Sequence, residues 1–459
     1  MSPATRLLTA LTVTIGLTPA AAAADRPNFI IILADDLGYG DLGCYGHPTI
    51  RTPHLDRMAI EGQKYTNAYV CAEVCTPSRA GLLTGRLPIR SGMCSHKRRV
   101  LFPDSAGGLP PSEVTIAKLL KDQGYATACV GKWHLGHLPQ YAPSRHGFDS
   151  HFGLPYVNDM DRVPGAKAWK IENFNVPLLR DGVIIERPAD QRTLTRRYTA
   201  EALKFVRQNK ARPFFLYLAH TFPHVPLFSA PPYLNTSPRG LYGDTVEEID
   251  ASTGQVLQAL KDEGLDKNTL VIFTSDNGPW LTFGVNGGSA GLLRDGKGST
   301  FEGGMREPFI ARWPGRVPAG KTVLDIISTL DLLPTFAKLA GTQPPADRAL
   351  DGYDISAVLF GTGPSPRDVM YYYRGEFLYA VRKGPYKAHF VTEDAYGQGD
   401  RHRQEHDPPL LYHLGHDPSE RFDVAKQHPE VIAEIRKLVE EHRKTIQPVE
   451  NQLEKLIQK

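Results

Sequence analysis

The sequence predicts an α/β protein with a large central, mostly parallel sheet flanked by helices and a smaller C-terminal antiparallel sheet closed by a helix. Two observations predict it. Four short apolar runs rich in Ile, Val and Phe alternate with helical stretches, and such runs are typical of strands that are buried on both faces. After about residue 365 the pattern changes to short alternating runs followed by one amphipathic segment.

The four apolar runs are each followed by polar residues of catalytic type. The runs are 29–33, 126–130, 214–218 and 270–273. In that order they lead to Asp35 and Asp36, to Lys132 and His134, to His220 and His224, and to Asp276 and Asn277. Because ligands bind at the carboxyl ends of the strands in open α/β sheets, we expect these clusters to meet at one rim.

Helical stretches are predicted between the runs. Ser112 is a candidate N-cap for a helix that Gly124 ends, and further helices are expected over 198–208 and 331–340. The Gly-rich stretch 284–308 is a long loop, which is more often functional than incidental.

The segment 75–85, CTPSRAGLLTG, predicts a helix that begins at Cys75. Pro77 suits a first-turn position and Gly85 can end the helix. Backbone N–H groups and the positive end of the helix dipole would meet at Cys75, with Arg79 one turn on, which suits a tetrahedral oxyanion. The same position would make the thiol more acidic. The alternative is a buried cysteine at the start of an ordinary helix.

The C-terminal part predicts an antiparallel sheet from runs 369–373, 378–381, 386–390 and 410–414, and a helix whose apolar stripe lies within 431–439. We interpret the stripe as core packing. The predicted organisation is a leader over 1–24, a catalytic domain over 25–365 and a smaller α+β domain over 366–459.

The leader resembles a secretory signal peptide. It has Arg6, an apolar run over 7–17 and five alanines at 20–24. It is too short to span a bilayer, and no other run of about 20 apolar residues occurs, so we expect export to the periplasm or medium without membrane insertion. The 53 Lys and Arg residues against 50 Asp and Glu residues give a net charge of +3, which argues against nucleic acid as a partner.

The five cysteines lie in the first third of the chain: Cys44, Cys71, Cys75, Cys94 and Cys129. This number is sparse for an exported protein and does not predict a disulfide scaffold. If Cys75 is modified, the other four could form up to two bridges or stay as buried free thiols.

A metal site is predicted from two strand ends. Asp35, Asp36, Asp276 and Asn277 supply three carboxylates and an amide oxygen, and hard oxygen ligands suit Ca²⁺ or Mg²⁺ better than zinc. The alternative for each acidic pair is ordinary solvation.

The spacing Cys75-x-Pro77-x-Arg79 with Thr84-Gly85 resembles the hallmark of the type I, formylglycine-dependent sulfatases. The resemblance extends over nearly the whole mature chain, and it is greatest to the arylsulfatase A and N-acetylgalactosamine-6-sulfatase branch. Further matching segments are 124–134, 220–224, 275–278, 291–304, 382–390 and 406–412.

This resemblance implies an alkaline-phosphatase-like fold and hydrolysis of an aryl or carbohydrate sulfate ester. A separate maturation enzyme would oxidise Cys75 to Cα-formylglycine, whose hydrate attacks sulfur, and Asp276 would help to deprotonate it. Ca²⁺ or Mg²⁺ would be held by Asp35, Asp36, Asp276, Asn277 and residue 75. His134 would then take a proton so that sulfate is released and the aldehyde is regenerated.

The resemblance also implies roles for the cationic side chains. Arg79, Lys132 and Lys297 would neutralise and orient the anion, and His224 with Lys297 would protonate the leaving oxygen. His220 and His406 are candidate substrate contacts, with a structural role as the alternative for both.

Two departures from the family pattern concern the substrate. After Pro155-Tyr156, similar members of the family carry a hydroxyl side chain and a His that contact the substrate, whereas this chain has Val157-Asn158 at those positions. The disulfide set of the animal lysosomal enzymes is also absent, which favours a bacterial exported enzyme acting on a different sulfate ester.

Three rival functions stay open. One is a formylglycine-dependent phosphonate or phosphodiester hydrolase. The second is a zinc phosphatase, which is less favoured because it would require His ligands and a Ser or Thr nucleophile. The third is an inactive sulfated-glycan-binding protein. Such a protein would have lost some catalytic positions, whereas this chain has kept all of them.

Overall fold

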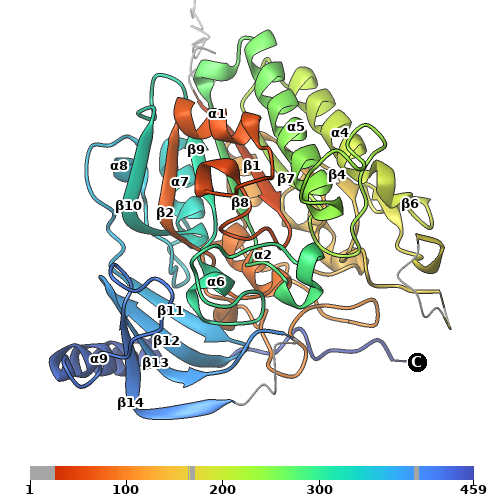
Figure 1. Ribbon diagram of the computed structural model, residues 1–459. Coiled ribbons are helices and arrows are strands. Elements are labelled where there is room, and N and C mark those ends of the chain that lie inside the picture. The colour runs from red at the N-terminus through yellow and green to blue at the C-terminus, as the bar shows by residue number, and fades with distance from the viewer. Residues whose placement is uncertain (1–25, 164, 166–170, 397–402, 459) are drawn as a thin grey trace, which may run out of the picture.

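Two sheets organise the chain, a ten-stranded one and a four-stranded one, which confirms the predicted fold class (Figure 1). The computed structural model describes residues 26–163, 165, 171–396 and 403–458. The predicted leader lies outside the described residues.

The large sheet is mixed but mostly parallel around its centre. Its strand order is β10-β2-β9-β8-β1-β7-β3-β4-β5-β6. Strands β8, β1, β7 and β3 are neighbours and run parallel, whereas β9 is antiparallel to both strands beside it. The strands are β1 (Asn28–Ala34), β2 (Gln63–Tyr69), β3 (Ala126–Gly131), β4 (Ser150–Gly153), β5 (Leu178–Arg180), β6 (Val183–Glu186), β7 (Phe214–Ala219), β8 (Thr269–Ser275), β9 (Phe309–Arg312) and β10 (Lys321–Ser328).

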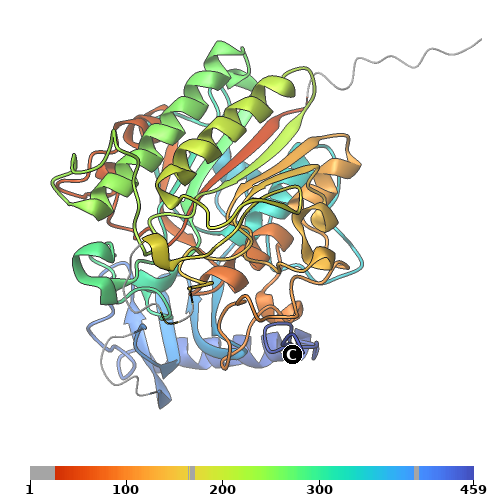
Figure 2. The same cartoon turned by 90° about the vertical axis from the view of Figure 1, so that its right-hand side faces the viewer.

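Helices cover both faces of this sheet because successive strand side chains point to opposite sides. Along β1, Phe29 and Ile31 pack in the cluster that contains α2, α3 and α7, while Ile30 and Ile32 pack in the cluster that contains α1, α4 and α5. The long helices α4 and α5 lie side by side in Figures 1 and 2. The helices are α1 (Pro53–Glu61), α2 (Cys75–Thr84), α3 (Ile116–Asp122), α4 (Leu194–Gln208), α5 (Leu241–Asp262), α6 (Glu302–Met305), α7 (Leu332–Leu339), α8 (Ser356–Leu359) and α9 (Pro429–Thr445).

One predicted helix start is wrong. Helix α3 begins at Ile116 and is capped by Thr115, whose hydroxyl oxygen accepts a hydrogen bond from the Lys118 amide at 3.1 Å. Thr115 is preferred over Ser112 because its hydroxyl also donates to the His146 carbonyl at 2.5 Å, which fastens the cap to the next loop.

The small sheet has the order β11-β12-β13-β14 and is antiparallel. It comprises β11 (Val369–Arg374), β12 (Phe377–Lys383), β13 (Tyr386–Thr392) and β14 (Gln404–His413). Helix α9 packs its apolar stripe on one face through Ile432, Ile435 and Val439. The stripe is therefore core packing, as expected.

A buried charge cluster joins the two sheets. Lys387 on β13 lies 2.9 Å from Glu302 at the start of α6 and 3.0 Å from Glu420, and all three side chains are fully buried. Lys387 also donates to the Thr300 carbonyl at 2.8 Å. Because buried charges are tolerated only when paired, this cluster holds the small sheet against the loop that precedes α6.

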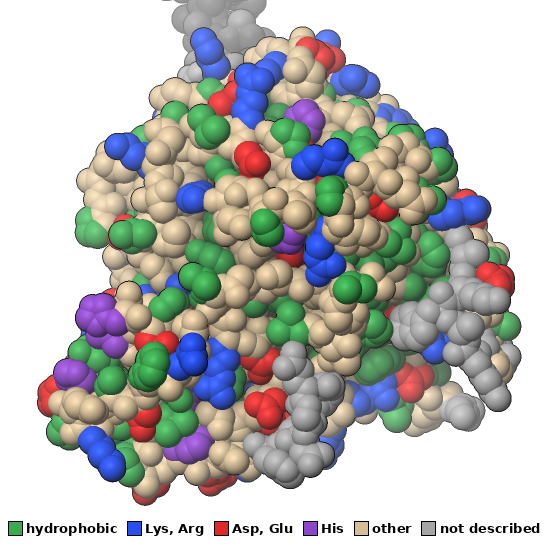
Figure 3. Space-filling model, viewed as in Figure 1, with side chains coloured by type: hydrophobic (Ala, Val, Ile, Leu, Met, Phe, Trp, Pro, Cys, Tyr) green, Lys and Arg blue, Asp and Glu red, His purple; other side chains and the backbone are tan. Residues whose placement is uncertain are grey.

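All five cysteines are free thiols, so neither of the two possible bridges forms. None of the described helices combines the length and apolar character that a membrane span requires. On the face seen in Figure 3, basic and acidic side chains are interspersed.

Candidate active site

The four polar clusters meet at one rim of the large sheet. Because β8, β1, β7 and β3 are adjacent and parallel, the residues after each strand leave the sheet on the same side. The Asp36 amide donates to Asp276 Oδ1 at 3.2 Å, which ties two of these strand ends together. The fold thus assembles residues that are up to 261 positions apart in the sequence.

Helix α2 brings Cys75 to this rim. The helix begins at Cys75 and ends at Gly85, whose φ of 67° is the left-handed conformation that favours glycine. Every residue of α2 is buried, and Cys75 Sγ lies 3.5 Å from Asp35 Oδ1. The first N–H groups of the helix face the rim and favour an anion there.

The expectation of an acidic thiol at Cys75 is wrong. Burial raises its pKa well above the usual value, and the carboxylates of Asp276 and Asp35 add to the rise. Desolvation disfavours the thiolate more than the helix dipole and the nearby lysines favour it. An unmodified Cys75 is therefore a weak nucleophile at neutral pH.

Three buried carboxylates at the rim are matched by three cationic side chains. Lys132 Nζ lies 2.5 Å from Asp35 Oδ2, Lys297 Nζ lies 2.8 Å from Asp36 Oδ2, and Arg79 Nε lies 2.8 Å from Asp276 Oδ2. The formal charges of these six groups cancel. A divalent cation would leave the centre positive and suited to an anionic ligand.

The residues present fit a hard divalent cation. One ligand atom from each of Asp35, Asp36, Cys75 and Asp276 lies within 4.8 Å of the others. Asn277 donates its amide N–H to Asp36 Oδ1 at 2.7 Å, and its own Oδ1 is buried without a partner. Burial raises the pKa of Asp36 and of Asp276 even beside Lys297 and Arg79, so a further positive charge at this position would favour the ionised carboxylates. Such an oxygen set suits Ca²⁺ or Mg²⁺.

Two histidines border the cluster as neutral imidazoles. His134 Nε2 donates to the Leu101 carbonyl at 2.9 Å, which leaves Nδ1 buried and free to accept a proton. His224 Nδ1 donates to the Val225 carbonyl at 2.5 Å, and its Nε2 lies 3.5 Å from Asp36 Oδ2. Burial lowers the pKa of both rings well below the usual value.

His134 is also held in an uncommon backbone conformation. Its φ of 59° lies in the left-handed region, which a residue with a side chain adopts at a cost of about 1–3 kcal/mol. The neighbouring structure therefore constrains the direction in which the ring points.

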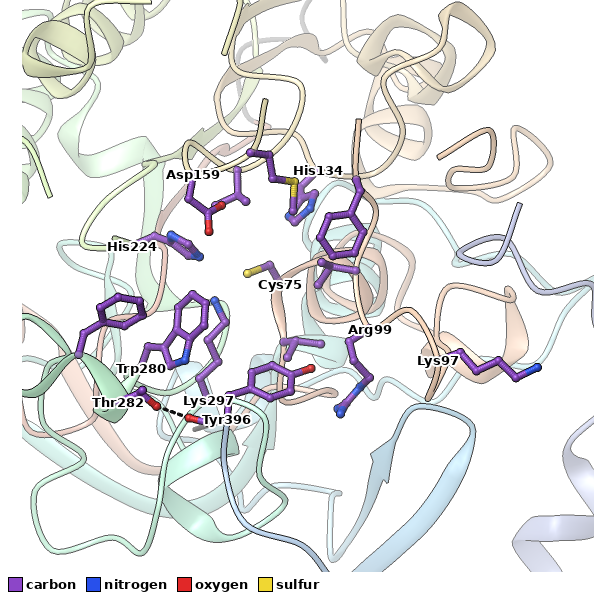
Figure 4. A pocket seen from close by; sticks show the side chains of 16 residues that line it. Cys75, Lys97, Arg99, His134, Asp159, His224, Trp280, Thr282, Lys297 and Tyr396 are labelled. Carbon is purple, nitrogen blue, oxygen red and sulfur yellow. Dashed lines mark hydrogen bonds between the residues drawn. The ribbon is translucent and has the colours of Figure 1, made fainter. Parts of the chain in front are cut away.

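A cavity of about 460 Å³ opens above Cys75. In Figure 4, Cys75 lies at its centre, with His134, His224 and Lys297 around it. Its remaining lining residues are Val74, Lys97, Arg99, Val100, Phe102, Val157, Asp159, Met160, Trp280, Thr282, Phe283 and Tyr396.

The two candidate substrate contacts, His220 and His406, and the departing residue Asn158 do not line this cavity. His220 is fully buried, with Nε2 3.5 Å from Ser252 Oγ on α5. His406 is hydrogen-bonded to Thr392 Oγ1 at 2.8 Å across β13 and β14. The side-chain amide of Asn158 donates to Gln191 and to the Pro226 carbonyl. Val157 and Asn158 are the pair that departs from the family pattern, and of the two only Val157 lines the cavity. These contacts favour the structural alternative for both histidines.

Sequence reasoning missed Arg99, Asp159, Trp280 and Tyr396. Trp280 lies three residues after Asn277, so its proximity to a predicted ligand was a usable signal. Tyr396 follows β13 of the small sheet, and its amide donates to the Lys297 carbonyl at 3.2 Å. No local pattern marks Arg99, Asp159 or Tyr396, because only the folded loops bring them to the cavity.

Comparison with known protein families gives two matches that together cover most of the chain. Residues 27–342 match the family model described as Sulfatase. Residues 365–459 match the model described as the C-terminal region of aryl-sulfatase.

Individual relatives match over nearly their full length. N-acetylgalactosamine-6-sulfatase of Canis lupus familiaris is 42% identical, with 95% of this chain and 89% of that protein covered. Arylsulfatase A of Homo sapiens is 43% identical, with 92% of this chain and 89% of that protein covered. The crystal structure of the PsFucS1 sulfatase from Pseudoalteromonas sp. superposes with a TM-score of 0.84 at 31% identity, with 94% and 93% of the two chains covered.

Proposed function

Because the chain belongs to the sulfatase family and is a sulfatase enzyme, we propose that it hydrolyses an aryl or carbohydrate sulfate ester with a formylglycine nucleophile formed from Cys75. The observation that carries the proposal is the position of Cys75, at the start of α2 and within 4.8 Å of three buried carboxylates. A divalent cation, Ca²⁺ or Mg²⁺, is the proposed cofactor, and a separate maturation enzyme is the proposed partner.

Asp35, Asp36, Asp276 and Asn277 would hold the cation, together with an oxygen of the modified residue 75 in place of Sγ. When bound, the cation would polarise the sulfate group, and formylglycine would supply the hydroxyl nucleophile. Asp276 Oδ1 lies on the rim beside Asp36 and is the candidate acceptor for the hydroxyl proton.

Arg79, Lys132 and Lys297 bind and neutralise the sulfate group in this proposal. Each is buried and already oriented by a carboxylate, so little reorganisation is required when charge develops in the transition state. Burial alone would lower the pKa of Lys297, but the combined attraction of Asp36 and the other anionic neighbours, among them Asp35, raises the pKa, so the ammonium stays charged.

His134 and His224 each take part in a different proton transfer in this proposal. The free Nδ1 of His134 accepts a proton in the step that releases sulfate. His224, with Lys297, donates a proton to the leaving oxygen. Burial lowers the pKa of His224, and a bound sulfate anion would favour its imidazolium form.

We further propose export to the periplasm or medium after removal of residues 1–24, with 25–365 as the catalytic domain and 366–459 as the smaller one. The basis is the leader composition and the change of sequence pattern near residue 365.

Assays of the matured protein on aryl sulfates, sugar sulfates, a phosphonate monoester and a phosphate diester test the proposal. We expect the highest kcat/KM on a sulfate ester, because the relatives that match most of the chain are sulfatases; charge alone does not separate the substrates, since all of them are monoanions. A higher kcat/KM on the phosphonate or phosphodiester would favour the rival hydrolase, and binding of sulfated glycans without turnover would favour the inactive binding protein.

His224→Ala should lose much more activity on a sugar sulfate than on nitrophenyl sulfate. A sugar alkoxide is a poor leaving group that depends on protonation, whereas nitrophenolate leaves readily without it. We expect a loss of about 10²–10⁴-fold in kcat/KM on the sugar ester and a small loss on the aryl ester.

Steady-state kinetics on both esters measures this difference. Equal losses on the two substrates would instead indicate that His224 binds the sulfate group they share, and Lys297 would then be the remaining proton donor.

A further inference from the structure

Asp159 is a half-buried acidic side chain of the cavity with one carboxylate oxygen that accepts no hydrogen bond within the described chain. It lies in the loop after β4, its Oδ1 is buried, and no described residue donates a hydrogen bond to it. Figure 4 shows its carboxylate pointing into the opening beside His224. A buried carboxylate oxygen without a donor is unfavourable unless a ligand supplies one.

The cations nearest to the cavity already have partners. Lys297 is paired with Asp36, and Arg99 is paired with the buried Glu73. Lys97, at the mouth, is 66% exposed and lies 3.5 Å from Glu454. Beyond the sulfate site, each lining cation therefore lies against a carboxylate, although Arg99 Nη2 makes no hydrogen bond, whereas Asp159 Oδ1 has neither a hydrogen bond nor an ion pair among the described residues.

Aromatic side chains form the wall below this carboxylate. Trp280 packs edge-on against Phe283, with ring centroids 4.9 Å apart, and lies 6.4 Å from the Tyr396 ring. A sugar ring has apolar C–H faces and hydroxyls at its edge, so it can pack on aromatic rings while a hydroxyl donates to a carboxylate.

We propose that Asp159 determines specificity by accepting a hydrogen bond from a free hydroxyl of the leaving group. The inference rests on the proposed function and narrows its substrate to carbohydrate sulfate esters with an unsubstituted hydroxyl near the ester. A second anionic group at this position is disfavoured, because Asp159 would repel it.

Three substrates separate this role from proton donation by His224: a monosaccharide sulfate with free hydroxyls, the same sugar sulfate with those hydroxyls O-methylated, and nitrophenyl sulfate. Asp159→Ala should lower kcat/KM about 10–100-fold on the free sugar, the range for a lost hydrogen bond to a charged group, and change the other two little. Asp159→Asn keeps an acceptor oxygen and should lose less. His224→Ala should lose activity on both sugars.

Asp104→Asn is the matched control, since it removes an exposed carboxylate, paired with Arg98, that does not line the cavity. Equal losses on all three substrates in both Asp159 variants, or no loss in either, would overturn the inference while the proposed function stands. If the matured wild type releases sulfate from none of the three, the proposed function fails and the inference fails with it. Unfolding midpoints of the variants separate a lost contact from a lost fold.

Discussion

Replacing Cys75 with Ala is expected to lower kcat/KM on nitrophenyl sulfate by at least about 10⁴-fold, because the variant has no side chain that can become the nucleophile. The fold should survive, since the change removes one buried sulfur atom at the start of α2 and breaks no ion pair. The measurement combines steady-state kinetics with mass spectrometry of the peptide that contains residue 75.

In active wild-type protein, that peptide should carry an aldehyde in place of the thiol. Burial raises the pKa of Cys75, which disfavours the unmodified thiolate as the nucleophile. Cys44→Ala is the control, because Cys44 is half-buried and distant in sequence from the cavity lining. Full activity in a preparation whose residue 75 is entirely unmodified would falsify the formylglycine proposal.

Removal of divalent cations is expected to abolish activity, and Ca²⁺ or Mg²⁺ should restore it. Without the ion, three carboxylates and three cations cancel, so the centre loses the positive charge that attracts and polarises the sulfate group. Asp276→Asn should lower kcat/KM about 10²–10³-fold and weaken cation binding, as expected when an electrostatic contact to the reacting group is lost.

Asn is preferred to Ala at this position because Arg79 Nε donates to Asp276. Asp276→Ala would remove the nearer of the two carboxylates that pair with the buried Arg79 guanidinium and leave Asp35 at 3.6 Å, so a loss of stability could not be told from a loss of metal. Metal content and calorimetric titration of chelated protein measure binding directly, with Asp104→Asn as the control. Recovery by Zn²⁺ alone would favour the zinc-phosphatase alternative.

The central sheet was predictable because its signals are local. A run such as 29–33 is apolar at every position, which only a strand covered on both faces tolerates, and Pro77 and Gly85 mark the two ends of α2. The polar residues after each run were likewise readable, because parallel strands present their carboxyl ends on one side.

The depth to which the side chains of the site are buried was not predictable from the sequence. The spacing around Cys75 indicated a helix N-terminus and hence an acidic thiol, but the depth of the site depends on loops from distant segments. Both His220 and His224 follow the apolar run 214–218, and only the family resemblance gave them different roles. The structure turns His220 toward Ser252 on α5 and leaves His224 in the cavity.

The sequence alone therefore determined the fold class, the family resemblance and the residues that surround the nucleophile, since each depends on local spacing or on strand order. Only the tertiary structure decided which side chains line the cavity. Asp159, Trp280 and Tyr396 come from three separate loops, and their meeting depends on how those loops pack above the sheet rather than on any local pattern. The features that govern substrate choice are thus long-range, whereas those that govern the reaction are largely local.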